Sequence, residues 1–231
     1  MVLQQPLSPP ESESQLLCRA QKLAGLSVAT LAKGIDWPVP ERLTGHKGWL
    51  GDLLEQHLGA CAGSTAQPDF PHLGIELKTI PITPQGKPLE STFVSIVPLE
   101  ALTGVTWEQS DVCAKLRQVL WIPIMGERGE PIAEKIVCSP LLWRPSPQQW
   151  QQLQEDWCTL TDMMVLGDIG GLTAHHGTYL QVRPKGANAQ ERRWGVGPEG
   201  APIRTQPRGF YLRATFTQSL LKTAFFATLE R

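Results

Sequence analysis

An apolar run that carries two charged side chains places the strongest constraint on what this chain can fold into. Residues 74–82 are rich in isoleucine and leucine, which predicts a β-strand. Side chains in a strand alternate between faces, so Glu76 and Lys78 share one face and Leu77 lies on the other. Charged groups are costly to bury, so a largely apolar strand that carries this pair requires a functional reason.

A second carboxylate completes the pattern. Asp69 precedes Glu76 with six residues between them, and an aspartate that enters a strand from a loop can reach the same point in space. Carboxylate oxygens are the ligands that Mg²⁺ prefers, and a neighbouring lysine can orient water or stabilise charge on a phosphoryl group. This is the pattern of the PD-(D/E)xK nucleases, with Asp69, Glu76 and the Leu77 carbonyl as metal ligands. The alternative is a solvated strand face with an exposed ion pair.

The composition is that of a globular protein without general affinity for nucleic acid. Hydrophobic residues make up 41% of the 231 residues, charged residues make up 19%, and the formal net charge is −1. Proteins that coat DNA without sequence preference are usually basic overall, so composition argues against that class. It permits an enzyme that binds DNA through a local basic patch.

One segment supplies such a patch. Between residues 183 and 213, seven basic residues stand against two acidic ones, and five glycines indicate loops. The basic residues are Arg183, Lys185, Arg192, Arg193, Arg204, Arg208 and Arg213. Because an arginine fork matches two acceptors of guanine in the major groove, the segment is a candidate groove-entering element. A solvated charged loop is the alternative.

Other classes of site receive no support from the sequence. The five cysteines contain no CxxC pair, the five histidines show no metal-ligand spacing, and His72 is best explained as a loop residue. There is no phosphate-binding GxxxxGK(S/T) loop, so any use of ATP would belong to a partner. With no signal peptide and no apolar run long enough to span a membrane, we expect a cytoplasmic protein.

Hydrophobic spacing predicts a mixed α/β or α+β architecture. Helices are expected over residues 13–25, 27–32, 47–58, 147–166 and 217–229, the last capped by Thr217. Strands are expected over residues 74–82, 91–97, 115–124, 134–137, 178–182 and 210–212. A turn rich in proline and glycine separates the first two strands, so we expect them to form a hairpin that carries the acidic residues.

Eight segments extend the acidic motif into a resemblance that covers nearly the whole chain. They are residues 7–11 (LSPPE), 47–49 (KGW) with 54–55 (LE), 74–81 (GIELKTIP), 104–108 (GVTWE), 115–123 (KLRQVLWIP), 139–143 (SPLLW), 183–185 (RPK) and 207–212 (PRGFYL). In this order they resemble the MutH family, the strand-nicking endonucleases of bacterial mismatch repair. An isolated Asp…Glu-x-Lys pattern arises often by chance, whereas this series of segments is specific.

The resemblance implies a restriction-endonuclease-like fold, a mixed β-sheet flanked by helices in a single domain over residues 1–231, with two lobes around a DNA cleft. Catalytic residues would lie within about 47–120 and the DNA-reading segment at about 180–215. Glu55 and Lys115 would join Asp69, Glu76 and Lys78 in the catalytic set. For Glu55, a solvated helical glutamate remains the alternative.

The resemblance also implies contacts with DNA. The residues concerned are Lys47, Phe93, Arg183, Pro184, Lys185 and Tyr211. Arg183 and Pro184 would meet base edges, and Tyr211 would lie near the adenine amino group, where methylation is detected. Phe93 could equally be a core residue of the expected hairpin. Residues 189–204 and Gly186 depart from the family pattern, which leaves the details of sequence reading open.

The implied activity is Mg²⁺-dependent nicking of the unmethylated strand, 5′ to the G of hemimethylated or unmethylated GATC. The enzyme would be a monomer that MutL activates after MutS finds a mismatch. Two alternatives stay open: a restriction endonuclease that makes double-strand breaks at GATC, and a DNA-binding adaptor without catalysis. The single acidic constellation favours nicking over the first, and its completeness argues against the second. The sequence locates no MutL-binding surface and does not decide between one metal and two.

Overall fold

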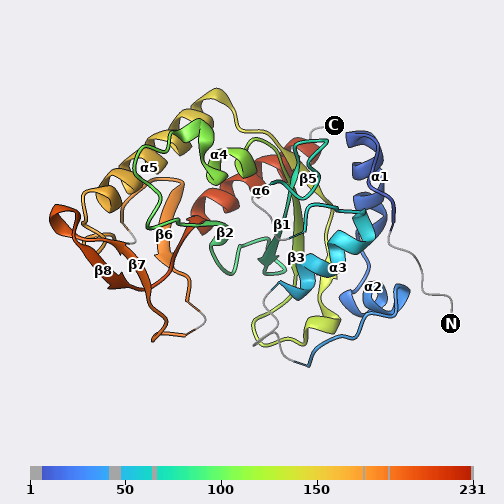
Figure 1. The fold of residues 1–231 in the computed structure, drawn as a ribbon. Coiled ribbons are helices and arrows are strands. Elements are labelled where there is room, and N and C mark those ends of the chain that lie inside the picture. The colour runs from blue at the N-terminus through green and yellow to red at the C-terminus, as the bar shows by residue number, and fades with distance from the viewer. Residues whose placement is uncertain (1–6, 42–47, 64–66, 174, 187, 230–231) are drawn as a thin grey trace. The chain divides into compact units, whose positions relative to one another are not determined.

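The computed structural model describes residues 7–41, 48–63, 67–173, 175–186 and 188–229. The chain divides into two units, the first formed by Met1–Glu90, Arg117–Arg144 and Gln218–Arg231 and the second by Ser91–Leu116 and Pro145–Thr217. Both units contain helices and strands (Figure 1). The predicted mixed α/β class is confirmed.

A sheet of mixed direction forms the centre of the first unit. Its strands are β1 (Glu76–Ile82), β3 (Val119–Met125), β4 (Ile136–Val137) and β5 (Leu141–Trp143). β1 pairs in parallel with β3, and β4 and β5 both pair antiparallel with β3. A strand that is buried on both faces needs a nearly continuous apolar run, which β3 supplies with its sequence VLWIPIM.

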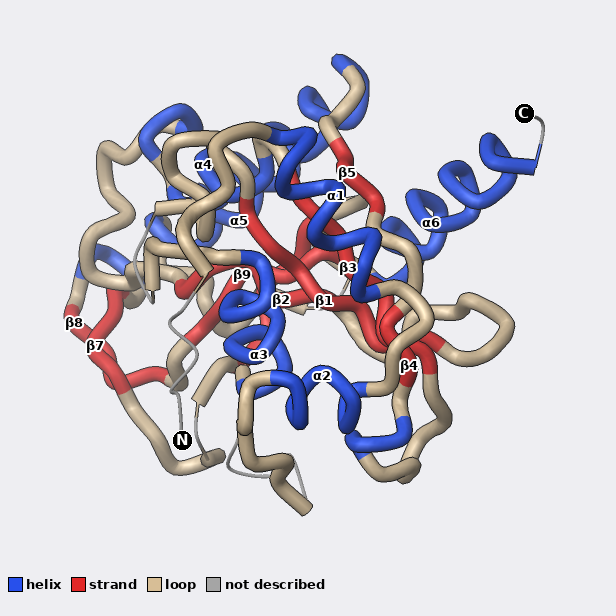
Figure 2. The backbone as a smooth tube through the Cα atoms, turned by 90° about the vertical axis from the view of Figure 1, so that its right-hand side faces the viewer, coloured by secondary structure: helices blue, strands red, loops and turns tan. Residues whose placement is uncertain are grey.

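Three helices cover one face of this sheet, as Figure 2 shows. They are α1 (Glu13–Leu23), α2 (Val28–Gly34) and α3 (Trp49–Leu58). Leu16, Leu53 and Leu54 are fully buried and share one hydrophobic core with residues of β1 and β3. Ser12 caps α1, because its side chain accepts a hydrogen bond from the Gln15 N–H. α3 ends at Gly59 in the left-handed conformation, as expected.

An antiparallel sheet in the order β2-β9-β6 forms the centre of the second unit. A separate hairpin, β7–β8, lies between β6 and β9 in the sequence. The strands are β2 (Thr92–Ile96), β6 (Leu180–Pro184), β7 (Arg193–Val196), β8 (Pro202–Thr205) and β9 (Arg208–Leu212). The helices are α4 (Asp111–Leu116), α5 (Pro147–Val165) and the start of α6 (Ala214–Leu229), which continues into the first unit. Short 3₁₀ turns occur at Trp107–Gln109, Ile132–Glu134 and Pro198–Gly200. No helix in the described part of the chain is long and apolar enough to cross a membrane.

Several expectations from the sequence were wrong, because contacts that the sequence pattern did not indicate determine the structure of these segments. The expected hairpin does not form, since β1 pairs with β3 and β2 pairs with β9. Lys115 lies in a helix rather than a strand, because the Ser110 hydroxyl caps α4 by accepting from the Cys113 N–H. Thr217 lies inside α6, where its hydroxyl donates to the Arg213 carbonyl. The stretch 189–204, expected to be a loop, contains β7 and β8.

A buried carboxylate on α5 holds the start of β6. Asp156 is 4% exposed, and its oxygens accept hydrogen bonds from the backbone N–H groups of Thr178, Tyr179 and Leu180 at 2.6–2.8 Å. The Gln152 side chain donates to the same carboxylate at 3.0 Å. Bonds to a charged acceptor are among the strongest in proteins, so Asp156 determines where β6 enters the sheet.

The Asp156→Ala variant is expected to lose on the order of 3 kcal/mol of stability, because one buried and two part-buried N–H groups lose their charged acceptor. Urea denaturation followed by circular dichroism measures the change. Asp162→Ala, on an exposed position of the same helix, is the matched control and should remain near wild type. Equal stability of the two variants would contradict the role given to Asp156.

Candidate active site and nucleic-acid interface

Three of the predicted catalytic side chains gather at the start of β1. Glu76 is 1% exposed, and its Oε1 lies 2.5 Å from the Lys78 Nζ in an ion pair. The Asp69 carboxylate is 9% exposed and accepts a hydrogen bond from the Leu77 N–H at 2.7 Å. The pair is therefore not on a solvated strand face, which was the alternative interpretation. Buried charges in such an arrangement are typical of functional sites.

A tight turn explains why Asp69 reaches β1. The backbones of Phe70 and Ile75 bond to each other in both directions, at 2.9 and 3.3 Å, so residues 70–75 fold back on themselves. Gly74 has a φ of 66°, a conformation that side chains with a Cβ disfavour. The turn brings Asp69 beside Leu77, although the two are eight residues apart.

The backbone direction at Leu77 supports the prediction that its carbonyl is a ligand. The Glu76 N–H donates to the Gln118 carbonyl at 3.0 Å, on the β3 side. Successive residues of a strand direct their N–H and C=O groups to opposite sides, so both groups of Leu77 point away from β3. Its N–H meets Asp69 there, and its carbonyl oxygen therefore lies on the same edge of β1 as the Asp69 carboxylate.

Glu55 on α3 belongs electrostatically to this group. The pKa of its carboxyl is raised from 4.5 to about 7, first by burial and then by the charges of Asp69, Asp52 and Glu76, while Lys78 lowers it. A solvated helical glutamate would not have a pKa raised in this way. The clustering of Glu55 with the β1 residues, predicted only from the family resemblance, is thus visible in its environment.

The residues present fit a divalent cation. Asp69, Glu76 and the Leu77 carbonyl provide hard oxygen donors, which suit Mg²⁺. A cation would offset the negative charges of Asp69, Asp52 and Glu76, which contribute, after burial, to the raised pKa of Glu55. Among the described residues, no group of three or more His, Cys, Asp and Glu side chains is arranged to hold a metal ion. The candidate set accordingly relies on two carboxylates and one backbone carbonyl.

A second cluster, in the second unit, contains most of the predicted DNA contacts. Phe93 on β2 lies opposite Tyr211 on β9, and their rings meet edge to face with centroids 5.4 Å apart. The Lys185 Nζ lies 4.2 Å from the centroid of the Phe93 ring. The Arg183 Nη1 donates to the Ser91 hydroxyl at 2.8 Å, and Pro184 follows on the same strand. Antiparallel pairing of β2, β9 and β6 brings these residues together.

Two further predicted residues complete the set. Lys115 is in the last turn of α4, in the second unit, whereas Asp69 and Glu76 belong to the first unit. Lys47 lies outside the described residues.

Phe93, Tyr211 and Lys185 form an aromatic cluster, and Gly209 belongs to it although it was not predicted from the sequence. A Cβ at this position would lie 2.9 Å from the Phe93 Cε2 and 3.2 Å from the Tyr211 Cε2. Only a glycine lets the two rings approach the β9 backbone this closely. The available signal was a glycine inside a strand, which marks a close approach of another group.

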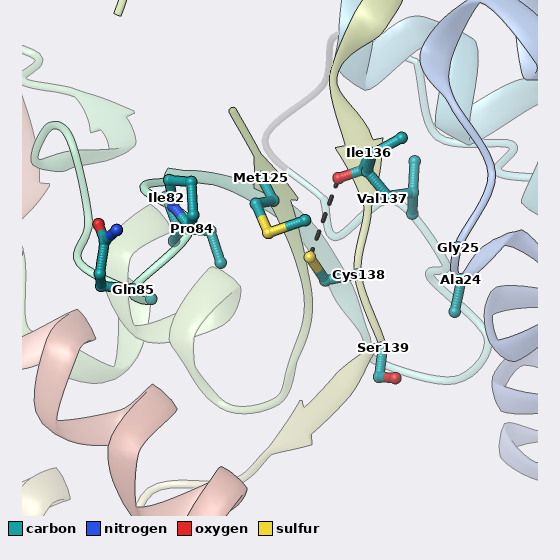
Figure 3. A pocket seen from close by; sticks show the side chains of 11 residues that line it. Ala24, Gly25, Ile82, Pro84, Gln85, Met125, Ile136, Val137, Cys138 and Ser139 are labelled. Carbon is teal, nitrogen blue, oxygen red and sulfur yellow. Dashed lines mark hydrogen bonds between the residues drawn. The ribbon is translucent and has the colours of Figure 1, made fainter. Parts of the chain in front are cut away.

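A hollow of about 480 Å³ in the first unit offers no comparable chemistry (Figure 3). Apolar side chains such as Met125, Ile136 and Val137 line much of it. Its one thiol, Cys138, donates to the Ile136 carbonyl, and burial raises the pKa of that thiol. A thiol with a raised pKa is a poor nucleophile at neutral pH, so the acidic edge of β1 is the better candidate site.

The raised pKa of Glu55 predicts a pH dependence of stability in the absence of divalent cations. A pKa that is higher in the folded state means that folding favours the protonated form. The contribution to stability is therefore complete below about pH 4.5 and is lost as the pH rises through about 7. Urea denaturation in EDTA across this range should show a smaller decline for Glu55→Gln than for wild type. The exposed control Glu11→Gln should follow wild type, and identical curves for all three would contradict the assignment.

The Gly209→Ala variant is expected to displace the Phe93 ring, because a Cβ–carbon distance of 2.9 Å is too short. Loss of the nuclear Overhauser contacts between the Phe93 and Tyr211 rings measures the displacement. Gly170→Ala, at a position where a Cβ has open space, is the control. Unchanged ring contacts in Gly209→Ala would show that the cluster tolerates the added methyl group.

Comparison with known proteins agrees with this geometry. A family model described as "DNA mismatch repair enzyme MutH" matches residues 58–156. Proteins named "DNA mismatch repair protein MutH" from Serratia proteamaculans and Vibrio cholerae are 53% and 54% identical over 94% and 92% of this chain and 96% of each relative. The protein of that name from Escherichia coli K12 is 52% identical over 95% of this chain and 96% of its own length. On the strength of this similarity, the chain belongs to the MutH family.

Proposed function

We propose that this protein is a Mg²⁺-dependent endonuclease of methyl-directed DNA mismatch repair, acting in the cytoplasm. It nicks the unmethylated strand 5′ to the G of hemimethylated or unmethylated GATC sites. The observation that carries the proposal is the buried group of Asp69, Glu76 and Lys78 at the start of β1, with Glu55 coupled to it. Relatives of more than half identity named as DNA mismatch repair proteins support it.

Asp69, Glu76 and Lys78 have different roles in phosphodiester cleavage. Bound by Asp69, Glu76 and the Leu77 carbonyl, Mg²⁺ would neutralise charge on the phosphate that is cut. Lys78 shares the face of Glu76, so its ammonium contacts the scissile phosphate or orients the attacking water. Glu55 helps to position that water from α3. Lys115 provides a further phosphate contact.

The aromatic cluster reads the DNA. Arg183 and Pro184, at the end of β6, meet the base edges, where an arginine fork suits guanine. Tyr211 lies near the adenine amino group, where an added methyl group would clash, and Phe93 and Lys185 contact the duplex around it. The contact of Lys185 with the Phe93 ring and the edge-to-face contact of Phe93 with Tyr211 preorganise the three side chains before DNA arrives. Lys47 is a further DNA contact in this proposal.

The proposal includes regulation by partners. A monomer with one acidic constellation cuts one strand, which is the outcome that strand-directed repair requires. MutL activates the enzyme after MutS has located a mismatch, and the ATP used in the process is hydrolysed by those partners.

Plasmid nicking with Mg²⁺, with and without MutL and ATP, tests the proposal. Nicked circles are expected from unmethylated and hemimethylated GATC plasmids and none from fully methylated plasmid. Lys78→Ala should nick roughly 100- to 1,000-fold more slowly, since it removes a charge that stabilises the transition state. Lys87→Ala, an exposed lysine in the turn after β1, should nick at the wild-type rate.

Two results would contradict the proposal in different ways. Linear products at early times would indicate double-strand cleavage of the restriction-enzyme type. Specific binding to GATC duplexes without cleavage on any substrate would indicate a DNA-binding adaptor. Full activity of Lys78→Ala would leave the function standing and overturn the assigned site.

A further inference from the structure

The outer face of the β7–β8 hairpin carries an exposed aromatic–cation pair that the proposed function does not use. Trp194 on β7 lies directly opposite Arg204 on β8, and both are exposed, Trp194 to 48%. The Arg204 guanidinium carbon lies 4.9 Å from the centroid of the indole ring. Such a cation–π contact holds the arginine in one place on the surface.

The opposite face of the hairpin is anchored, so the exposed pair has a defined orientation. Gly195 is buried, and a Cβ there would lie 3.5 Å from both the Ile169 Cδ1 and the Leu99 Cβ. Strand side chains alternate between faces. Since Gly195 faces the body of the second unit, its neighbour Trp194 and the cross-strand partner Arg204 face away from it.

Several arginines lie at the open end of the hairpin, where β7 begins and β8 ends. Arg192, Arg193 and Arg204 lie at this end, whereas Glu199 lies in the turn that closes the other end. Glu191 forms an ion pair with Arg193 at 3.4 Å. The open end therefore retains the charges of Arg192 and Arg204.

The open end is continuous with the proposed DNA-reading residues. The Lys185 N–H donates to the Pro207 carbonyl at 2.7 Å, and the Gln206 side chain donates to the Ala189 carbonyl at 2.9 Å. Arg208 lies opposite Pro184 in the sheet. Arg208 follows Arg204 by four positions, which at full extension span at most about 14 Å. A duplex rises by this distance over about four base pairs.

We infer that Trp194 and Arg204 form a second DNA contact, to duplex that flanks the GATC sequence. This inference rests on the proposed function. Arg204 binds a backbone phosphate outside the recognition sequence, and Trp194 packs against the neighbouring sugar. A guanidinium carries five N–H donors, so the contact with the indole ring leaves donors for phosphate oxygens. Within the described residues, one of these donors bonds to the Arg192 carbonyl at 3.3 Å.

Charge and position favour DNA over a protein as the occupant of this face. Tryptophan and arginine are also common at the centres of protein interfaces, but those centres are usually depleted of charge. Here Arg192 and Arg204, which form no ion pair with any described residue, stand within a few residues of the base-reading strand. The contact carries no base information and adds affinity through the phosphate and the sugar.

Fluorescence anisotropy with two GATC duplexes tests the inference, without divalent cation so that no cleavage occurs. One duplex extends about two base pairs beyond GATC on each side and the other about ten, since the contact lies up to about four base pairs away. Arg204→Ala and Trp194→Ala should each weaken binding to the long duplex roughly five- to tenfold and leave the short duplex unaffected. For Arg204→Ala, the slope of log affinity against log salt on the long duplex should fall by about 0.9.

The controls remove the same charge or a similar apolar surface elsewhere. Lys222→Ala removes one exposed charge from α6, and Leu166→Ala truncates a side chain that is 76% exposed. Both should bind the long duplex as wild type does. Circular dichroism verifies that the two hairpin variants are folded.

Each other outcome has a separate meaning. Wild-type affinity and slope of both hairpin variants on the long duplex would overturn the inference while leaving the proposed function intact. Normal DNA binding by the variants with a loss of MutL-stimulated nicking would overturn it in favour of a protein contact. Failure of the wild-type protein to bind either duplex would overturn the proposed function itself.

Discussion

The parallel pairing of β1 with β3 is the constraint on which the candidate active site depends. It uses one edge of β1 for backbone hydrogen bonds and leaves the other edge to Asp69, whose carboxylate accepts the Leu77 N–H. The same alternation directs the Leu77 carbonyl to the Asp69 side. If β1 slipped by one residue against β3, Glu76 and Lys78 would exchange faces with Leu77, and the cluster would be lost. The long apolar run of β3 fixes that register.

The candidate active site places several carboxylates close together at buried positions, where desolvation makes a charge unfavourable. Glu76 is nearly inaccessible, Asp69 is buried, and the pKa of Glu55 is raised to about 7. One ammonium, that of Lys78, offsets part of the charge. A protein that gained only stability from these residues would do better with apolar side chains. The arrangement is therefore best understood as preparation for a cation and a phosphate.

In the second unit, contacts between side chains restrict long residues such as Lys185 before a ligand binds. Lys185 would lose much conformational freedom on binding, and its contact with the Phe93 ring restricts it in advance. Gly209 makes room for that ring, and Asp156 fixes the start of the strand that carries Arg183. None of these supporting contacts involves residues close together in the sequence.

The sequence by itself determined the helices with clear caps, the apolar strands and the identity of the acidic residues. Ser12, Gly59 and the alternation of Glu76 and Lys78 act over a few residues, where stereochemistry decides the outcome. Only the tertiary structure decided that β1 pairs with β3 rather than β2. It also decided that residues 189–204 form a hairpin with an exposed tryptophan. Strand partners are chosen by which apolar faces can be buried together, and that choice depends on segments distant in the chain.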